Sequence, residues 1–328
     1  MSFRWRPMES KDVISCAEII AAHPVIGPRY GTAIKGLGRA WQRLLGTEAM
    51  TTAVFEDIER GRTRLAGVGV GVFVCDEFVR EIKTPPQFWV GPVLVERILN
   101  GASPVLSDKE VRSANSGDGL NELVWETLTL PSYSMRTEMY HLMGRAFIDI
   151  HRGFRLKEMI TSQAESPERL RWAIDAGGLY WDSKTARYIK SLRREAKNLV
   201  KEPHIVGITR ELEFARPGSW VGSLFDYHPP RFGFSASERR LLSSGISNRF
   251  QTDIALSLNL DVSLPTVKKT WLSIYDRVSR HVPELFDDNA IAGTKRGKEK
   301  RRRLLAYLQE HPEELRPTVR RRIGHRPR

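Results

Sequence analysis

The spacing of apolar residues changes abruptly near residue 230, and this change constrains the fold most. Before it, short apolar runs alternate with stretches of helical spacing, whereas residues 235–280 show helical spacing alone. A chain of 328 residues also exceeds what one hydrophobic core usually holds. The sequence therefore predicts an α+β domain over residues 1–215, a linker over 216–230, a helical domain over 231–288, and a basic C-terminal helix and tail over 289–328.

Strands and helices are expected to alternate over residues 1–200. The expected helices are 11–22, 34–45, 135–151 and 167–176, and the expected strands are 52–57, 65–75, 120–128 and 156–162, with a proline- and glycine-containing loop between strands. The first helix is expected to bury Val13, Ile14, Ala17, Ile20 and Ala21. Such alternation favours a sheet with helices packed against its faces.

Several classes of protein are disfavoured by composition. The longest apolar run, Leu65 to Cys75, is about half of the roughly 20 residues that a membrane-spanning helix needs. The charged amino terminus lacks the apolar segment of a signal peptide. Two cysteines, Cys16 and Cys75, cannot form a disulfide framework or a four-thiolate zinc site. We therefore expect a cytoplasmic protein that binds no membrane and no metal.

Positive charge is concentrated at the end of the chain. Of a net charge of +13, residues 289–328 contribute 13 Lys and Arg against 4 Asp and Glu. A run of cations precedes an apolar cluster and is expected on a short amphipathic helix, among them Lys295, Arg296, Lys298, Arg301, Arg302 and Arg303. Such a block attracts nucleic acid by releasing counterions, without sequence preference. A solubilising tail is the alternative interpretation.

Local signals place three helices in the C-terminal region. Ser235 and Glu238 are spaced as a capping box, and Gly245 is the expected end of the first helix, because glycine adopts positive φ readily. A second helix is expected over residues 252–259, with contacts made by Ile254, Ala255 and Leu258. The third is expected to begin at Ser263, whose side chain can cap the exposed amides.

The third helix has two distinct faces. Apolar residues at i, i+4, i+7 and i+11 predict its buried side: Val267, Trp271, Ile274 and Val278. Its outer side carries Thr266, Lys269, Thr270, Ser273 and Arg277. Hydroxyls and cations of these types bind phosphate oxygens and base edges. Two helices joined by a short turn form the motif that inserts its second helix into a major groove, although the same periodicity also fits a bundle that docks a protein.

The residues themselves resemble the LuxR-type helix-turn-helix. The resemblance rests on the segments FSASERRLL (234–242), GISN (245–248), DIALSL (253–258), VSLPTVKK (262–269) and SIYDRV (273–278). In that family the segment beginning at Ser263 is the recognition helix, so the resemblance implies that Thr266, Lys268 and Lys269 face DNA. It implies a bacterial-type transcription regulator that binds double-stranded DNA. Dimers are expected, because paired recognition helices read two-fold symmetric operators.

The N-terminal region is similar to the GNAT acetyltransferase superfamily in a few landmarks. These are Phe3 to Pro7 with Asp12, the strand at 67–74, and Ala146 to Phe154. The similarity implies a GNAT-like mixed sheet with flanking helices. That superfamily binds acetyl-CoA through a glycine-rich loop at a helix start, where the helix dipole meets pyrophosphate. No such loop is found, since Ser116 to Leu120 lacks the preceding cation and enters a predicted strand, so no cofactor is predicted and acetyl-CoA is left open.

No catalytic motif stands out in the sequence. Glu126, Tyr140 and His141 have side chains that can serve as acid or base. His141 and His151 lie on one expected helix, where structural roles are the simpler interpretation.

We expect a DNA-binding transcription regulator whose N-terminal GNAT-like domain senses a small-molecule effector or mediates dimerisation. The alternative is an acetyl-CoA-dependent acyltransferase with an accessory helical docking domain. Because no catalytic or cofactor-binding motif was found, the sequence favours the regulator over the enzyme.

Overall fold

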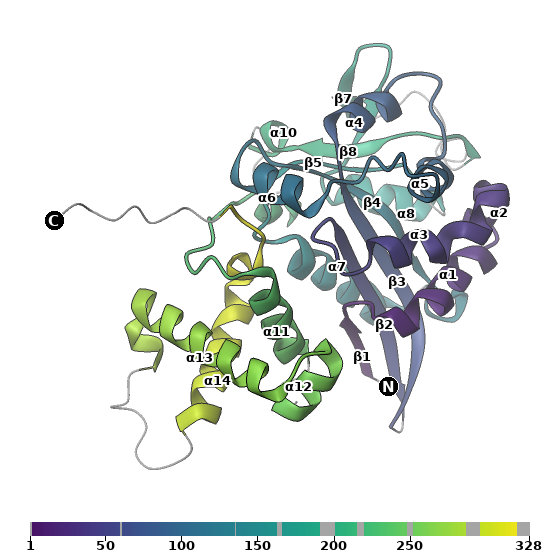
Figure 1. Ribbon diagram of the computed structural model, residues 1–328. Helices are drawn as coiled ribbons and strands as arrows, with labels where there is room; N and C mark the ends of the chain where they lie inside the picture. Colours follow the sequence, from purple (N-terminus) through teal and green to yellow (C-terminus); the bar gives the residue numbers. More distant parts are fainter. Residues whose placement is uncertain are drawn as a thin grey trace. The chain divides into compact units, whose positions relative to one another are not determined.

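The computed structural model of the chain describes residues 2–59, 61–134, 136–162, 166–190, 201–214, 220–247, 252–286 and 296–319. The chain divides after Asp226 into two compact units (Figure 1). In the described residues, unit 1 (1–226) combines a sheet with helices, and unit 2 (227–328) contains helices alone. The mixed α+β class expected from the sequence is therefore confirmed.

One eight-stranded sheet organises unit 1, in the order β1-β2-β3-β4-β5-β8-β6-β7. Its strands are β1 (Ser2–Arg6), β2 (Met50–Glu59), β3 (Arg62–Val74), β4 (Leu120–Thr129), β5 (Leu156–Thr161), β6 (Leu179–Asp182), β7 (Arg187–Ile189) and β8 (Val206–Thr209). Neighbouring strands are antiparallel except β4 and β5. A parallel pair needs a crossover, and α7 (Thr137–His151) supplies it.

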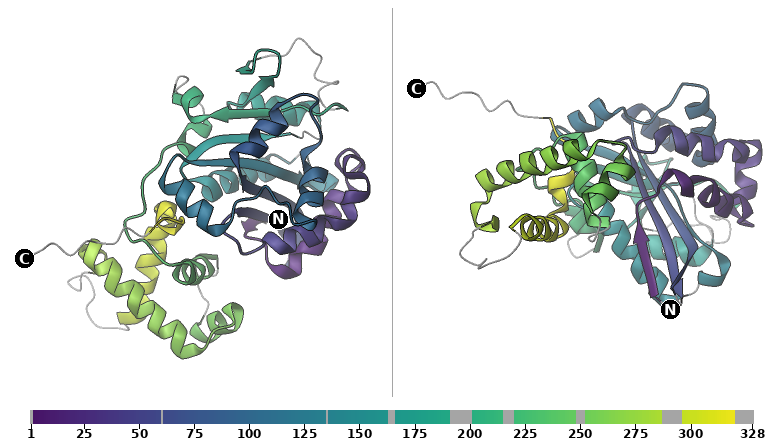
Figure 2. Two further views of the ribbon diagram at one scale, coloured as in Figure 1. Left: turned by 45° about the horizontal axis from the view of Figure 1, so that its top comes forward. Right: turned by 60° about the horizontal axis from the view of Figure 1, so that its bottom comes forward.

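Helices cover both faces of this sheet (Figure 2). One face packs against α1 (Val13–Ala22), α2 (Ile26–Tyr30), α3 (Leu37–Leu44), α4 (Asp76–Lys83) and α5 (Val90–Leu99). The other packs against α6 (Asp108–Ser116), α7 and the short helix η4 (Trp220–Leu224). Further elements of unit 1 are α8 (Pro167–Asp175), α10 (Arg210–Phe214), η1 (Ser10–Asp12), η2 (Gly31–Gly36) and η3 (Pro131–Tyr133).

The sequence of β3 explains how this strand packs differently on the two faces of the sheet. Side chains alternate along a strand, and Val68, Val70, Val72 and Val74 all enter the core beneath α1 and α5. The intervening glycines leave space on the opposite face. A Cβ atom at Gly71 would lie 2.0 Å from Glu122 Oε1, so a side chain here would displace that buried carboxylate.

Part of unit 1 differs from the expectation. The expected proline-glycine loop contains three helices, α4, α5 and α6. The strands β1, β6, β7 and β8 were not expected. The first helix buries Val13 and Ile20 as expected, but Cys16 and Ile19 are buried beside them, whereas Ile14 is 67% exposed.

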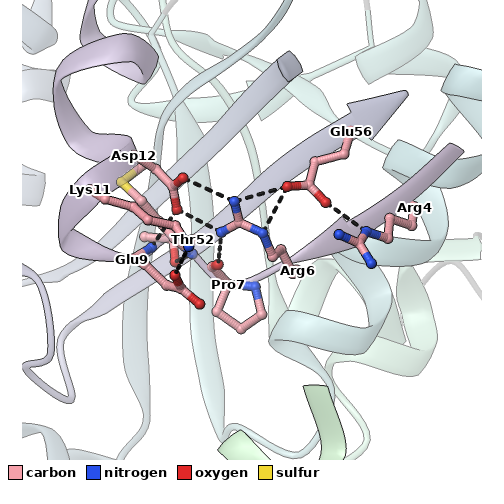
Figure 3. Close-up of polar contacts among 9 residues, drawn as sticks. Arg4, Arg6, Pro7, Glu9, Lys11, Asp12, Thr52 and Glu56 are labelled. Atoms are coloured by element: carbon pink, nitrogen blue, oxygen red, sulfur yellow. Dashed lines mark hydrogen bonds and ion pairs between the residues drawn. The ribbon is translucent and has the colours of Figure 1, made fainter. Parts of the chain in front are cut away.

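An arginine joins three elements near the start of the chain (Figure 3). The Arg6 guanidinium on β1 donates to both carboxylate oxygens of Asp12, at 2.6 and 2.9 Å, and to Glu56 on β2 at 2.9 Å. Arg4 donates to the second oxygen of Glu56 at 2.6 Å. Burial alone would raise the pKa of Asp12, but hydrogen bonds from Arg6 and from the Glu9 N–H outweigh it and lower the pKa.

Arg6→Ala is expected to lower the free energy of unfolding of unit 1 by about 2 kcal/mol at pH 7, because it leaves two partly buried carboxylates without their shared cation. A lowered folded-state pKa of Asp12 stabilises the fold above the ordinary carboxylate pKa and ceases to do so as pH falls through the folded value. The difference between variant and wild type should therefore shrink below about pH 4. Hydrogen exchange of β1 and β2 amides in the full chain measures it.

Arg80→Ala is the matched control, because the ion pair of Arg80 with Glu77 has side chains that are 73% and 74% exposed. Exposed pairs contribute about 0–1 kcal/mol. Equal protection of β1 in Arg6→Ala and wild type at pH 7 would contradict the role given to Arg6.

Unit 2 is built around one apolar core. Its elements are α11 (Ala236–Ser247), α12 (Asp253–Leu260), α13 (Leu264–His281), η5 (Pro283–Phe286), α14 (Arg296–Glu310) and η7 (Pro312–Leu315). The core joins residues of α11, α12, α13 and α14, with Trp271 and Leu242 among the buried side chains. The buried carboxylate of Glu314 accepts the N–H groups of Arg231 and Phe232 at 2.9 and 3.0 Å, which fixes the beginning of the unit to its end.

Two details of the expected helices are wrong. Gly245 does not end α11 but lies inside it, where a Cβ atom would come within 3.3 Å of Leu305 and 3.7 Å of Trp271. The close approach of α14 explains the glycine. On α12, Leu256 is buried, whereas Ile254 and Leu258 are 61% and 76% exposed. The contact face of α12 is thus opposite to the expected one.

Where they are described, both segments beside the expected helical domain belong to a folded unit. Of the expected linker at 216–230, residues 216–219 lie outside the described residues, and Val221 and Leu224 are buried in the core of unit 1. The amphipathic helix expected within 289–328 is present as α14, and it buries Leu304, Leu305 and Leu308 in the core of unit 2. Apolar side chains thus draw both segments into the folded units.

Candidate functional site

The start of α13 is held by the expected cap. Ser263 is the N-cap residue, and its side chain accepts a hydrogen bond from the Thr266 N–H at 3.3 Å. Pro265 lies in the first turn, where its missing N–H costs no helical hydrogen bond. The prediction made for Ser263 is confirmed, so the chain itself fixes where this helix begins.

Two faces of α13 are clearly separated. The buried residues are those expected: Val267, Trp271, Ile274 and Val278. On the other side, Thr266, Lys268 and Lys269 are exposed, and Thr270 is half-buried, with its hydroxyl donating to the Thr266 carbonyl at 2.8 Å. Within the described part of the chain, no carboxylate lies within ion-pair distance of Lys268 or Lys269. The first half of α13 therefore presents two lysines to solvent.

Two residues of the expected outer side of α13, Ser273 and Arg277, make hydrogen bonds within unit 2. Arg277 makes two charged hydrogen bonds to Glu238, at 2.8 and 3.0 Å, and a third to the Gly233 carbonyl at 3.1 Å. The Ser273 hydroxyl lies 3.3 Å from the same Glu238 carboxylate. Sequence reasoning placed Ser273 and Arg277 on the outer stripe. In the structure they join α13 to the start of α11.

Glu238 also caps the start of α11. Its carboxylate accepts the Ser235 N–H at 2.7 Å, while its own N–H donates to the Ser235 hydroxyl at 3.3 Å, so the predicted capping box is confirmed. Burial would raise the pKa of Glu238, but these bonds and the charge of Arg277 outweigh it and lower the pKa. The carboxylate is thus held ionised between the two helices.

The cations expected near the C-terminus have specific partners where they are described. Lys295 lies outside the described residues, as do the side chains of Arg296 and Lys298. Arg301 pairs with Asp253 and lies over the Trp271 ring at 4.4 Å. Arg302 and Arg303 both pair with Glu299, at 2.7 and 3.3 Å. Arg301 therefore fastens α14 to α12 and α13, while Arg302, with a side chain 78% exposed, remains accessible.

Unit 1 contains a cleft where β4 and β5 separate. The two strands pair only over Leu120–Leu123 and Leu156–Ile160. A cleft of about 400 Å³ lies beyond, lined by β4, β5, β8, α7 and α8 and mostly apolar. Tyr140 and Trp172 meet edge to face on its wall, with ring centroids 4.1 Å apart, and Arg169 lies over the Tyr140 ring at 4.8 Å. This cleft can accept a ligand with a substantial apolar part.

Two of the three acid-base candidates line cavities in this region. Glu126 is 3% exposed and borders a second cavity of about 170 Å³ that shares Thr127 and Arg169 with the cleft. Its carboxylate accepts the Tyr30 hydroxyl at 2.5 Å, and Tyr30 in turn accepts the Trp125 Nε1–H at 3.0 Å. Tyr140 lines the cleft itself. His141 is exposed and lines none of the three cavities described.

His151 is buried in a separate polar cluster. Its Nδ1 lies 2.8 Å from the Phe147 carbonyl, and its Nε2 lies 3.0 Å from Glu122 Oε1. Thr51 donates to the same oxygen at 3.1 Å. The ring joins the end of α7 to β4, as the structural interpretation of this histidine expects. No three His, Cys, Asp or Glu side chains gather as metal ligands within the described ranges.

The start of α7 lacks the features of a pyrophosphate site. Met135 lies outside the described residues; its neighbour Arg136 is the N-cap of α7 and makes no side-chain cap bond. Glu138 places a carboxylate in the first turn, where it disfavours an anionic ligand. The pair Gly117 and Gly119 leads into β4, a strand, as expected. The glycine pair therefore does not lie at a helix start, and the first turn of α7 carries a carboxylate.

None of the protein-family models searched matches the chain, and no curated protein matches it either. In the part of the chain that the structure describes, helices are too short or too polar to cross a membrane. What α13 and the cleft can bind is therefore inferred from their geometry.

Proposed function

We propose that the chain is a DNA-binding transcription regulator that inserts the first half of α13 into a major groove. One observation supports this most: Thr266, Lys268 and Lys269 are exposed on a helix whose opposite face is fixed in a four-helix core. Lysine binds guanine O6 and N7, and threonine binds bases or phosphates. The proposal includes the LuxR-type helix-turn-helix assignment and a homodimer on a two-fold symmetric operator.

The fixed start of α13 suits this role. The Ser263 cap occupies one of the amides at the helix start, and the helix dipole leaves partial positive charge there. Phosphate groups are attracted to such a terminus. Arg302 on α14 adds an accessible cation in the same unit. Backbone contacts of this kind would position the protein, while Lys268 and Lys269 would contact bases.

Titration of the full chain with duplex DNA at several salt concentrations tests the proposal. We expect the affinity for duplex DNA to fall steeply as the salt concentration rises. The slope of log affinity against log salt concentration should be proportional to the number of phosphates that the protein neutralises. Absence of duplex binding at about 50 mM salt would overturn it, because non-specific binding is strongest under that condition.

The cleft in unit 1 is assigned to a small-molecule effector. One observation favours the alternative of an acyltransferase, since the buried carboxylate of Glu126 lies beside the cleft like a general base. Residues at the start of α7 do not fit the pyrophosphate of acetyl-CoA, so we derive no transfer step. An effector would act by binding one state of the protein more tightly than another.

Substitutions at Gly144 test whether acetyl-CoA binds in the cleft of unit 1. It lines the cleft, and a Cβ atom added there meets no atom within 4 Å. A ligand at 100 times its Kd adds about 2.7 kcal/mol of stability. We expect acetyl-CoA to leave the melting temperature of the wild-type chain unchanged.

Gly144→Trp and Gly144→Ala are the paired variants. Tryptophan fills the cleft, whereas alanine is expected to stabilise α7 by about 0.5–1 kcal/mol through helix propensity alone. An acetyl-CoA-induced rise in melting temperature that persists in Gly144→Ala and disappears in Gly144→Trp would instead favour the acyltransferase.

A further inference from the structure

An exposed leucine lies among the cations of α13. Leu272 is 63% exposed, although its neighbour Trp271 is 3% exposed. A single exposed leucine is common on protein surfaces and needs no explanation by itself. Its place on the helix is more informative. Lys269 and Lys268 precede it by three and four residues, so the three side chains lie on one face.

This face continues toward the start of the helix. Pro265, Lys268, Lys269 and Leu272 are all exposed and have the spacing i, i+3, i+4 and i+7. Side chains that contact bases recur at this spacing on recognition helices. Ser273 and Arg277 lie on another side of α13 and are bound to Glu238. The stripe that ends at Leu272 is therefore the one most available to a groove.

We propose that Leu272 recognises a thymine by packing against its 5-methyl group. The inference rests on the proposed DNA-binding function and adds a sequence preference to it. An aliphatic side chain neither donates nor accepts a hydrogen bond. In the major groove the apolar group that it can contact is the methyl group of thymine.

The geometry of the helix also sets where the thymine lies. Leu272 is about 5 Å along the axis from the lysines, at about 1.5 Å per residue. Base pairs follow one another at about 3.4 Å along the duplex. The thymine recognised by Leu272 thus lies within about two base pairs of a guanine contacted by Lys268 or Lys269.

The test replaces thymine by deoxyuridine, which removes only the methyl group. A preferred duplex is first selected from a random pool with the full chain, and each thymine is then replaced in turn. Fluorescence anisotropy gives the Kd for wild type, Leu272→Ala and Leu258→Ala. Leu258 is the matched control, because it is an equally apolar residue, 76% exposed, on α12.

For wild type we expect deoxyuridine to weaken binding about fourfold at one position, the effect of losing contact with one methyl-sized group. Leu272→Ala should bind both duplexes equally at that position, while Leu258→Ala should keep the fourfold difference. Unchanged melting of Leu272→Ala would exclude misfolding as the cause.

Two negative results are distinguishable. Selective DNA binding in which Leu272→Ala retains the wild-type response at every thymine would overturn this inference alone, and would assign the exposed leucine to a protein partner. Failure of the full chain to bind any duplex would overturn the proposed function and the inference together.

Discussion

Alanine at both Lys268 and Lys269 is expected to weaken duplex binding about 100-fold near 0.1 M salt, since each lysine contact to a base or phosphate contributes about 1–3 kcal/mol. If either lysine contacts phosphate, the salt slope should also decrease by about one for each. Stability should change by less than about 0.5 kcal/mol, because both side chains are exposed. Anisotropy titrations at several salt concentrations measure both effects.

Net charge alone also affects DNA affinity, so the control must remove the same charge. Lys109→Ala/Lys184→Ala removes two exposed lysines of unit 1. We expect this variant to bind nearly as tightly as wild type. Equal losses in the two double variants would mean that α13 is not the contact surface.

Trp271→Ala should lower the free energy of unfolding of unit 2 by about 3–5 kcal/mol, the usual cost of removing a large buried aromatic side chain. Trp271 is 3% exposed, stacks on Tyr275 with centroids 5.7 Å apart, and lies beneath the Arg301 guanidinium. Its loss would loosen α11, α13 and α14 together. Hydrogen exchange of α11 and α13 amides in the full chain measures the effect.

The neighbouring variant Leu272→Ala is the control for this measurement. Leu272 lies on the same helix but is 63% exposed, so its removal should cost less than about 0.5 kcal/mol. Similar exchange rates in the two variants would show that the buried face of α13 is not the centre of the core.

The beginning and the buried face of α13 could be predicted from the sequence because the signals are local. Ser263 lies three residues before the amide that it caps, and the apolar repeat from Val267 to Val278 fits a single helical face. Which exposed residues contact DNA stays a prediction. Local spacing gives the face of a helix but not its partner.

The buried face of α12 could not be predicted for a physical reason. Ile254, Leu256, Leu258 and Leu260 alternate with small or polar residues, so a helix through them has an apolar stripe on each side. Packing against α13 selects Leu256. That choice depends on residues far along the chain, which a local pattern does not contain.

Similar reasons explain the errors in unit 1. The helix α5 begins with Val90, Gly91 and Pro92, which resemble a loop, although proline is tolerated in a first helical turn. The strands β6 and β7 are four and three residues long and depend on pairing with each other and with β8. Strands this short carry too little alternation to be recognised in sequence.

The sequence placed Arg277 on the outer side of α13, but in the structure its guanidinium is bound to Glu238. Glu238 lies 39 residues earlier, so local spacing could not reveal this pair. That pair has a consequence for the proposed contact with nucleic acid. A guanidinium fork matches a carboxylate and a phosphate with the same two-bond geometry. If α13 binds DNA as proposed, Glu238 takes the place of a phosphate at this guanidinium and keeps the arginine from the sugar-phosphate chain unless the carboxylate is displaced.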